Sequence, residues 1–332
     1  MTESKLELSI ALSENENTRA ILDGRIQPDA IKLHATPLHP SEMFWRQLKF
    51  AEFDVSEMSM SSLTIATSQG PTEWVALPVF TTREFFHLRM LVRVASGIQA
   101  PADLKGKRVG VPEYQQTAAI WSRGVLQHEF GVHPREIEFF MERTPETSHG
   151  GATGFKAPEG ITVHQIPLTT NIGEMMVRGE LDATLLYLTH ANLVDRSRIN
   201  LASDTRIKPL FERAAEAKRY FAKTGIYQIN HGMVIRRPIF ERHPWAALNI
   251  YNAFAKARGD VIRARDISLL RHFEPGLIGD DVRKALATDP MAYGVKGNRK
   301  VLETITQYVH EQGLTTRRVA LEEMFATSTM DL

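Results

Sequence analysis

Short runs rich in β-branched and aromatic residues alternate with longer segments of helical periodicity, and this alternation constrains the fold more than any other feature of the sequence. Such alternation is typical of β–α crossover units, in which helices connect largely parallel strands. We therefore expect an α/β protein. The β-rich runs are 6–12, 53–55, 75–80, 88–94, 108–111, 136–140, 162–166, 182–187 and 232–236.

Two segments between these runs have clear helical stripes. One lies between 111 and 136, where Gly131 is placed to end the helix in a left-handed cap. The other begins at Pro244. Both stripes are expected to pack in a core. Their apolar residues are Ala118, Trp121 and Val125 in the first and Ala247, Ile250, Tyr251 and Phe254 in the second.

The length and charge of the chain narrow its architecture and its partners. A single core rarely supports 332 residues, so two compact lobes are expected. The composition of 43% hydrophobic and 24% charged residues is that of an ordinary globular protein. The formal net charge of +1 gives no field that would attract nucleic acid or an anionic membrane. Any preference for an anion must therefore be local.

The sequence also bears on the compartment. It contains no cysteine, which excludes disulfides and thiolate chemistry but does not distinguish one redox compartment from another. The run 6–12 alternates apolar and polar residues like a strand, which differs from the continuous apolar run of a signal peptide. No apolar stretch is long enough to span a bilayer. We therefore expect a cytoplasmic protein.

The segment 109–117 runs from a strand through a turn into a helix. The first N–H groups of such a helix and its dipole favour an anion. Thr117 could donate a hydrogen bond to a carboxylate, and Arg123 adds charge if it faces the same cleft. The alternative is an ordinary strand-to-helix junction in which Thr117 caps the helix.

The segment 53–59 is a short strand with polar residues at its carboxyl end. Glu57 could act as a general acid or base if it is desolvated near a ligand. The alternative is a surface glutamate that caps the next helix.

Arg83 and His87 lie between two β-rich runs. The guanidinium of Arg83 matches a carboxylate, and His87 can exchange protons near neutral pH. On a strand, Glu84 and His87 would point to opposite faces, so this pair does not predict a metal site. His231 stands alone at the start of a strand, where a histidine is more often structural. The segment 144–160 lacks periodicity and is rich in Gly, Pro and Thr, which predicts a long loop that could serve as a lid.

A combination of motifs is spread over nearly the whole chain, at 18–20, 52–59, 78–80, Arg83, 86–87, 103–115, 117–118, 123–124, 179–183, 224–226 and His231. Many binding proteins of type 2 carry a segment like 103–110, DLKGKRVG, but its combination with the single residues elsewhere is much more specific. Together these positions resemble the 4,5-dihydroxyphthalate decarboxylase family.

The resemblance implies a two-lobed periplasmic-binding-protein type 2 fold with the ligand between the lobes. Residues 1–90 and 190–332 would form the first lobe, and residues 91–189 would form an inserted second lobe. The implied reaction converts 4,5-dihydroxyphthalate to protocatechuate and CO2. This reaction requires no metal and no organic cofactor, because a phenol para to the departing carboxylate can accept the electron density. Assembly into a homo-oligomer is compatible with the sequence.

The resemblance and the residue chemistry together nominate the site. His87, His231 and Glu57 are the acid–base candidates, without a ranking among them. The same fold also serves receptors, so a solute-binding protein or a ligand sensor for a small aromatic carboxylate is the alternative function. The candidates for substrate binding are Arg83, Arg123, Arg19, Tyr114, Thr117 and Ser59.

Overall fold

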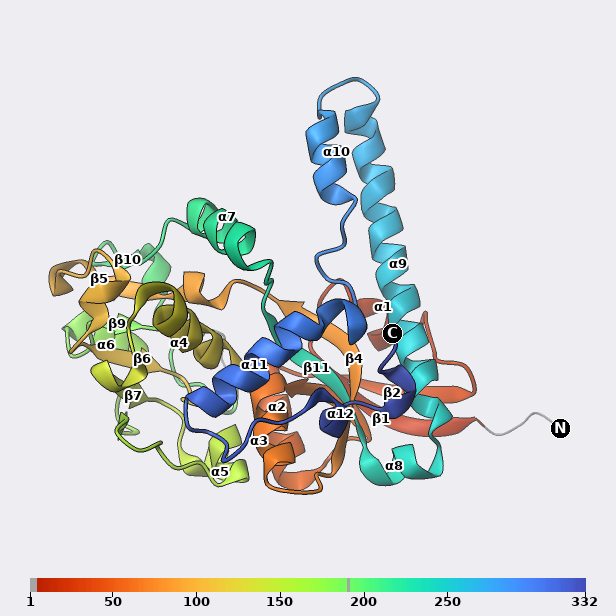
Figure 1. Cartoon of the computed structure of the whole chain (residues 1–332), viewed down its shortest axis with the longest axis horizontal. Coiled ribbons are helices and arrows are strands. Elements are labelled where there is room, and N and C mark those ends of the chain that lie inside the picture. The colour runs from red at the N-terminus through yellow and green to blue at the C-terminus, as the bar shows by residue number, and fades with distance from the viewer. Residues whose placement is uncertain (1–4, 190–191) are drawn as a thin grey trace.

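The computed structural model describes residues 5–189 and 192–332, which form two β-sheets flanked by helices (Figure 1). The predicted α/β class is therefore confirmed. The first sheet has the order β2-β1-β3-β11-β4 and comprises β1 (Leu6–Leu12), β2 (Ile31–Pro37), β3 (Val55–Ser59), β4 (Trp74–Arg83) and β11 (Ile229–Arg236). The second has the order β10-β5-β9-β6-β7-β8 and comprises β5 (Leu91–Arg93), β6 (Arg108–Val111), β7 (Glu138–Met141), β8 (Thr162–Gln165), β9 (Ala183–Thr184) and β10 (Ile207–Pro209).

Both sheets are mixed, whereas the sequence predicted mostly parallel ones. In the first sheet, β1 pairs in parallel with β2 and β3, but β11 is antiparallel to β3 and β4. In the second sheet, β6 is parallel to β7 and β9 and β7 is parallel to β8, but β5 is antiparallel to β9 and β10. Antiparallel pairing occurs at the strands that carry the chain from one sheet to the other.

The chain enters the second sheet at β5 and leaves it after β10. The sequence placed the lobe boundary at residue 190 and predicted that the chain returns to the first lobe between about 187 and 231. β10, at 207–209, still pairs with β5 of the second sheet and lies inside that interval. The assignment of the two sheets to lobes that fold as units stays a proposal. The sequence did not predict the strands β2 and β10.

The helices include the two whose stripes the sequence showed. Helix α4 ends at Phe130, and Gly131 follows in the left-handed region with φ of 67°. Helix α9 follows Pro244 and buries Ala247, Ile250 and Phe254. The helices are α1 (Arg19–Leu22), α2 (Pro40–Phe50), α3 (Met60–Ser68), α4 (Thr117–Phe130), α5 (His149–Thr153), α6 (Ile172–Arg178), α7 (Arg213–Thr224), α8 (Arg237–Arg242), α9 (Trp245–Phe273), α10 (Asp280–Leu286), α11 (Arg299–Glu311) and α12 (Leu321–Met324).

A shared core fixes α4 to the first sheet. Trp121 of α4 is buried and donates its indole N–H to the carbonyl of Ile229 in β11 at 2.8 Å. Helix α11 packs against both α3 and α4. Gly124 permits this approach, because a Cβ atom there would lie 2.1 Å from the ring of Tyr308. The start of α4 is thus held in a defined position relative to β3 and β11.

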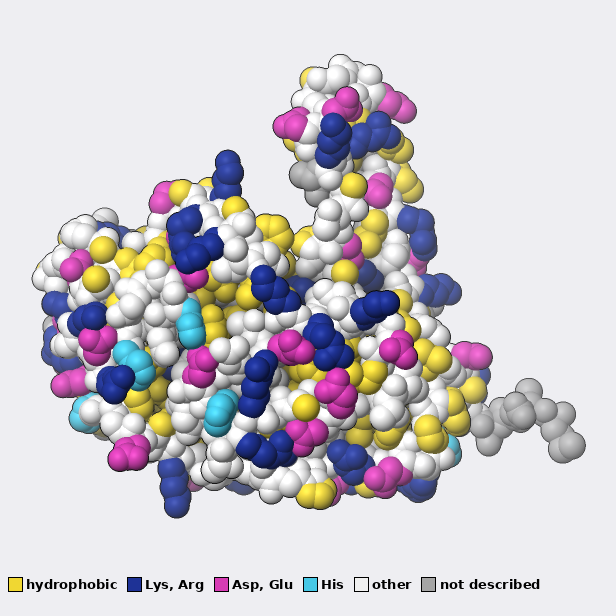
Figure 2. All heavy atoms as spheres, viewed as in Figure 1, with side chains coloured by type: hydrophobic (Ala, Val, Ile, Leu, Met, Phe, Trp, Pro, Cys, Tyr) yellow, Lys and Arg dark blue, Asp and Glu magenta, His cyan; other side chains and the backbone are white. Residues whose placement is uncertain are grey.

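The surface agrees with the low net charge. Figure 2 shows Lys and Arg side chains interspersed with Asp and Glu over the visible face, without a large patch of one sign. Among the described residues, no helix combines the length and the apolar character needed to cross a membrane.

Candidate active site

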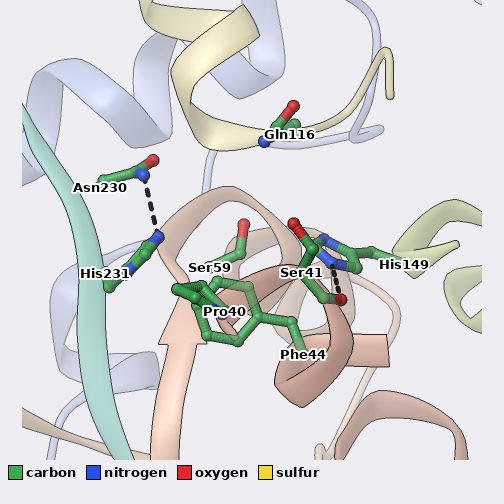
Figure 3. Close-up of a pocket in the computed structure, with 8 residues that line it drawn as sticks. All are labelled: Pro40, Ser41, Phe44, Ser59, Gln116, His149, Asn230 and His231. Carbon is green, nitrogen blue, oxygen red and sulfur yellow. Dashed lines mark hydrogen bonds between the residues drawn. The ribbon is translucent and has the colours of Figure 1, made fainter. Parts of the chain in front are cut away.

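A small cavity, partly open to solvent, lies where the loops that follow strands of both sheets meet (Figure 3). Helix α2 and strands β3 and β11 contribute to it from the first sheet, and the starts of α4 and α5 contribute from the second. Ligands of α/β sheets bind beyond the carboxyl ends of strands, which is the position of this cavity. Its lining residues are Pro40, Ser41, Phe44, Ser59, Gln116, His149, Asn230 and His231.

Three helices of eight or more residues begin at the cavity. Pro40 is the first residue of α2, Ser59 directly precedes α3, and Gln116 directly precedes α4. Side chains cap α2 and α3, whereas Gln116 makes no capping hydrogen bond. The first N–H groups of α4 are therefore available to an anion, and the three helix dipoles favour negative charge in the cavity.

Glu57 and His231 form a buried pair on adjacent strands. Glu57 is completely buried, and its Oε2 lies 3.1 Å from Nδ1 of His231. Ser13 donates from its backbone N–H and its hydroxyl to Oε1 at 2.7 and 2.6 Å, and Thr81 donates to Oε2 at 2.6 Å. Burial alone would raise the pKa of Glu57, but His231 and these donors lower it below its ordinary value. Glu57 is therefore an ionised partner of His231.

The pairing with Glu57 orients the imidazole of His231. Because Nδ1 faces a carboxylate, Nδ1 carries the hydrogen, and Nε2 is left to face Asn230, whose Nδ2 lies 2.9 Å away. His231 is 6% exposed and lines the cavity. With the amide of Asn230 turned so that its oxygen faces Nε2, an imidazole held in this way by a carboxylate can carry a proton on Nε2 beside the cavity.

Hydroxyl groups tie the end of β3 to the start of α4. Thr117 Oγ1 lies 2.8 Å from Ser59 Oγ and 2.9 Å from Ser61 Oγ, and it accepts the backbone N–H of Ser61 at 3.0 Å. Ser59 lines the cavity, and Thr117 follows the lining residue Gln116 in the sequence. The structure therefore brings together Glu57, His231, Ser59 and Thr117 of the predicted residues.

Tyr114 and Arg123 form a separate buried cluster. Arg123 donates to Gln312 Oε1 at 2.8 Å and to the carbonyl of Tyr114 at 2.7 Å, and its guanidinium lies 3.7 Å from the centre of the Tyr114 ring. Neither residue lines the cavity. Position 123 is about 240° around α4 from position 117, so the two side chains cannot share a face. Burial lowers the pKa of Arg123 below its ordinary value.

Arg83 and Arg19 also lie away from the cavity lining. Arg83, at the end of the edge strand β4, donates to the carbonyl of Ala292 at 2.6 Å and to Asn298 Oδ1 at 2.7 Å. Burial lowers the pKa of Arg83 to about 10. Arg19 is exposed and pairs with Glu14 at 3.3 Å. A role for these two arginines in substrate binding stays a prediction.

His87 is buried in a different part of the core. It lies in the short 3-10 helix Phe86–Arg89, with Nε2 at 3.2 Å from Glu216 Oε1 and Nδ1 at 3.4 Å from Gln228 Nε2. The rings of Phe85, Tyr220 and Phe211 surround it. Burial, opposed by Glu216, lowers the pKa of His87 to about 4. These contacts favour a structural role.

This environment predicts a pH effect on stability. His87 stays neutral in the folded protein down to about pH 4, whereas in the unfolded chain it gains a proton near pH 6.5. The unfolded state therefore binds more protons between these values, so the free energy of unfolding should fall as pH drops from 6.5 to 4, by up to about 3 kcal/mol. Urea unfolding of the wild type and of His87→Gln at pH 7.5 and 4.5 should show a smaller pH effect in the variant. His128→Gln, at an exposed pair with Glu311, should show the same pH dependence of the unfolding free energy as the wild type. The prediction would be refuted if His87→Gln also showed the wild-type pH dependence.

Residues that the sequence analysis missed complete the site. Phe44 of α2 lies edge-on to both His231 and His149, with ring centroids 4.7 and 5.5 Å apart. His149 begins α5, inside the segment 144–160 that was predicted to be a loop. The Ser148 cap and Gly154 at the end of α5 are signals that could have found this helix.

A buried ionic network supports α5 and α2. Arg143 is fully buried and donates to Asp195 Oδ1 at 2.7 Å, to Glu113 Oε2 at 3.0 Å and to Ser41 Oγ at 2.5 Å. Burial would lower the pKa of Arg143, but Asp195 and Glu113 raise it above its ordinary value. Burial likewise acts to raise the pKa of Asp195, and the charge of Arg143 lowers it to about 2. The network is ionised and links the second sheet to the first residues of α2.

No group of three or more His, Cys, Asp or Glu side chains placed to hold a metal ion occurs in the ranges 5–189 and 192–332. The expectation that the reaction needs neither metal nor cofactor stays a prediction.

Comparisons with solved structures show the fold. The alkanesulfonate-binding protein SsuA of Xanthomonas axonopodis is 14% identical with a TM-score of 0.57, and the match covers 98% of this chain and 99% of that one. The periplasmic aliphatic sulphonate binding protein SsuA of Escherichia coli is 14% identical with a TM-score of 0.58, over 99% and 94% of the two chains. The predicted periplasmic-binding-protein fold is confirmed.

Comparisons with curated proteins identify relatives by sequence. No family model matches the chain. A 4,5-dihydroxyphthalate decarboxylase of Pseudomonas putida is 36% identical over 182 residues, 55% of this chain and 70% of that protein. A 4,5-dihydroxyphthalate decarboxylase of Comamonas testosteroni is 31% identical over 333 aligned residues, covering 99% of this chain and 98% of that protein. This chain therefore belongs to the 4,5-dihydroxyphthalate decarboxylase family.

Proposed function

We propose that the protein decarboxylates 4,5-dihydroxyphthalate to protocatechuate and CO2 without a cofactor. The names of its curated relatives indicate this substrate and this reaction. The observation in the structure that supports catalysis most is His231, which is held by the buried Glu57 and lines a cavity where three helices begin.

Decarboxylation of this substrate requires three groups in the site. One carboxylate of the substrate leaves as CO2 after the ring carbon that bears it gains a proton. The hydroxyl para to that carbon releases electron density into the ring as the carbon is protonated. The second carboxylate does not react and must be held. The site therefore needs an acid at the ring carbon, a partner for the hydroxyl, and an anion site for the second carboxylate.

The helix starts provide the anion site. The uncapped start of α4, beside Gln116, presents N–H groups to the unreactive carboxylate, and the dipoles of α2 and α3 add to its attraction. Phe44 offers an apolar surface to the ring. A strong cation on the departing carboxylate would stabilise the substrate more than the transition state and oppose the reaction. Arg143 does not supply such a cation to the cavity, because its guanidinium already donates to the carboxylates of Asp195 and Glu113.

His231 is the acid in this proposal. When the amide oxygen of Asn230 faces Nε2, the imidazolium carries a hydrogen there, and this hydrogen goes to the ring carbon. The negative charge of Glu57 stabilises the imidazolium before the transfer. After CO2 has left, solvent returns a proton to Nε2. Glu57 itself stays ionised, because Ser13 and Thr81 donate to it throughout.

Incubation with 4,5-dihydroxyphthalate tests the proposal. Stoichiometric formation of CO2 and protocatechuate, unchanged by exhaustive dialysis against EDTA, is the expected result. Tight binding of the substrate without product would instead favour a solute-binding protein or a sensor, the function of the SsuA proteins that share the fold. Loss of turnover in EDTA that one divalent ion restores would contradict the cofactor-free mechanism.

A further inference from the structure

His149 lies across the cavity from His231, with Phe44 and Pro40 between them (Figure 3). It is 1% exposed, and it comes from α5, which lies in the chain between β7 and β8 of the second sheet, whereas His231 lies in β11 of the first sheet. The Phe44 ring touches both imidazoles edge-on. A planar ligand that packs on Phe44 is therefore within reach of both histidines.

The ring nitrogens of His149 have only long contacts within the protein. Nε2 lies 3.4 Å from the carbonyl oxygen of Ser41, and Nδ1 lies 3.5 Å from Ser62 Oγ. Both distances are at the outer limit of a hydrogen bond. A ligand hydroxyl that displaces one of these long contacts would give the buried imidazole a shorter hydrogen bond than it has within the protein.

The carboxylate beside His149 is more distant than the one beside His231. Glu113 is the nearest carboxylate, but its Oε2 lies 3.8 Å from Nδ1 of His149. Its oxygens accept from Arg143 at 3.0 Å and from the backbone N–H groups of Gly150 and His149 at 2.5 and 3.3 Å. Glu113 therefore holds the backbone at the start of α5 in place, and its charge only partly opposes the effect of burial on the pKa of His149.

The two histidines are thus suited to different tasks. Burial lowers the pKa of His149, so its imidazole is neutral at physiological pH and offers one N–H and one lone pair. A neutral imidazole is a good partner for a phenol. Two titratable groups whose environments differ in this way divide the acid and base roles between them.

We propose that His149 binds the hydroxyl para to the departing carboxylate and takes its proton during the reaction. This inference rests on the proposed function. The O–H bond breaks as its proton moves to His149, and the oxygen's electrons enter the ring while the para carbon forms a C–H bond with the proton from His231. The bond from that carbon to the carboxylate then breaks, CO2 leaves, and its electrons restore the aromatic ring and the phenolate, which regains its proton from His149.

Binding of two ligands that differ only in their hydroxyls tests His149 without turnover. Calorimetry of the whole protein with protocatechuate and with benzoate gives the ratio of their dissociation constants. In His149→Asn the affinity for protocatechuate should fall roughly tenfold, the value of one neutral hydrogen bond, while the affinity for benzoate stays unchanged. The control His164→Asn, at an exposed histidine of β8, should keep the wild-type ratio.

An unchanged preference for protocatechuate in His149→Asn would overturn the inference. If that variant also loses affinity for benzoate, the cavity has collapsed. His149→Gln, whose longer side chain keeps a polar group near Nε2, is then used to measure the same ratio of dissociation constants. The two proposals can be refuted independently. If the wild type releases no CO2 but His149→Asn loses the preference for protocatechuate, the decarboxylase function is refuted and His149 is a binding residue. If the wild type releases CO2 and His149→Asn keeps the preference, only the role of His149 is refuted.

Discussion

Replacing His231 by asparagine should lower kcat for 4,5-dihydroxyphthalate by roughly 10²-fold to 10⁴-fold, the range over which a positioned general acid contributes. Asparagine preserves a polar group near the ring position but cannot carry a proton. The helix starts that hold the substrate carboxylate are untouched, so the dissociation constant of protocatechuate should change little. A fall in kcat without a fall in affinity is the signature of an interaction made only in the transition state.

Glu57→Gln should lower kcat less, by roughly 10²-fold, because the amide keeps a hydrogen-bond partner for Nδ1 but removes the charge that stabilises the imidazolium. The pair His34 and Glu7 provides a matched control on the same sheet, since its imidazole and carboxylate lie 2.9 Å apart but are exposed. His34→Asn and Glu7→Gln should both retain wild-type kcat. Normal turnover in His231→Asn with intact binding would remove His231 as the acid.

The sequence predicted those elements whose bounds depend on residues close together in the chain, such as apolar alternation and glycine caps. The alternation in 6–12 gave β1 with its observed bounds, and Gly131 marked the end of α4 because a glycine tolerates the left-handed cap. β2, Ile31–Pro37, buries two of its seven residues and lies at the edge of the sheet, so its apolar alternation is weak. β10 has three residues and offers hardly any pattern at all.

Sequence reasoning named the residues of the candidate site that depend on their neighbours in the chain, and it did not name those that depend on tertiary contacts. Glu57 and Ser59 follow from their place at the carboxyl end of a strand. The division between His231 and His87 could not be predicted, because it depends on Glu57 facing one and on the aromatic cluster around the other. His149 was missed because two glycines and a five-residue helix leave no periodicity. The role of Arg143 could not be predicted either, because its partners Asp195, Glu113 and Ser41 are distant in the sequence.

Those partners make Arg143→Met the variant with the largest expected effect on stability. It leaves the carboxylates of Glu113 and Asp195 buried without a cation, at 1% and 2% side-chain exposure. Breaking a buried ion pair in this way costs about 3–5 kcal/mol of unfolding free energy. Arg206→Met, which breaks an exposed pair with Asp204, should cost less than about 1 kcal/mol.

Two further measurements separate lost charge compensation from a simple packing defect. Adding Glu113→Gln and Asp195→Asn to Arg143→Met removes the unpaired charges and should restore much of the stability, as neutral replacements of buried ion networks do. The folded-state pKa of Asp195, about 2, lies below its ordinary value of 3.8, so its stabilising contribution is present above pH 3.8 and is lost as the pH falls toward 2. The difference between the wild type and Arg143→Met should therefore shrink below pH 4 in thermal unfolding. A deficit that is independent of pH and persists in the triple variant would show that Arg143 supports the site through packing alone.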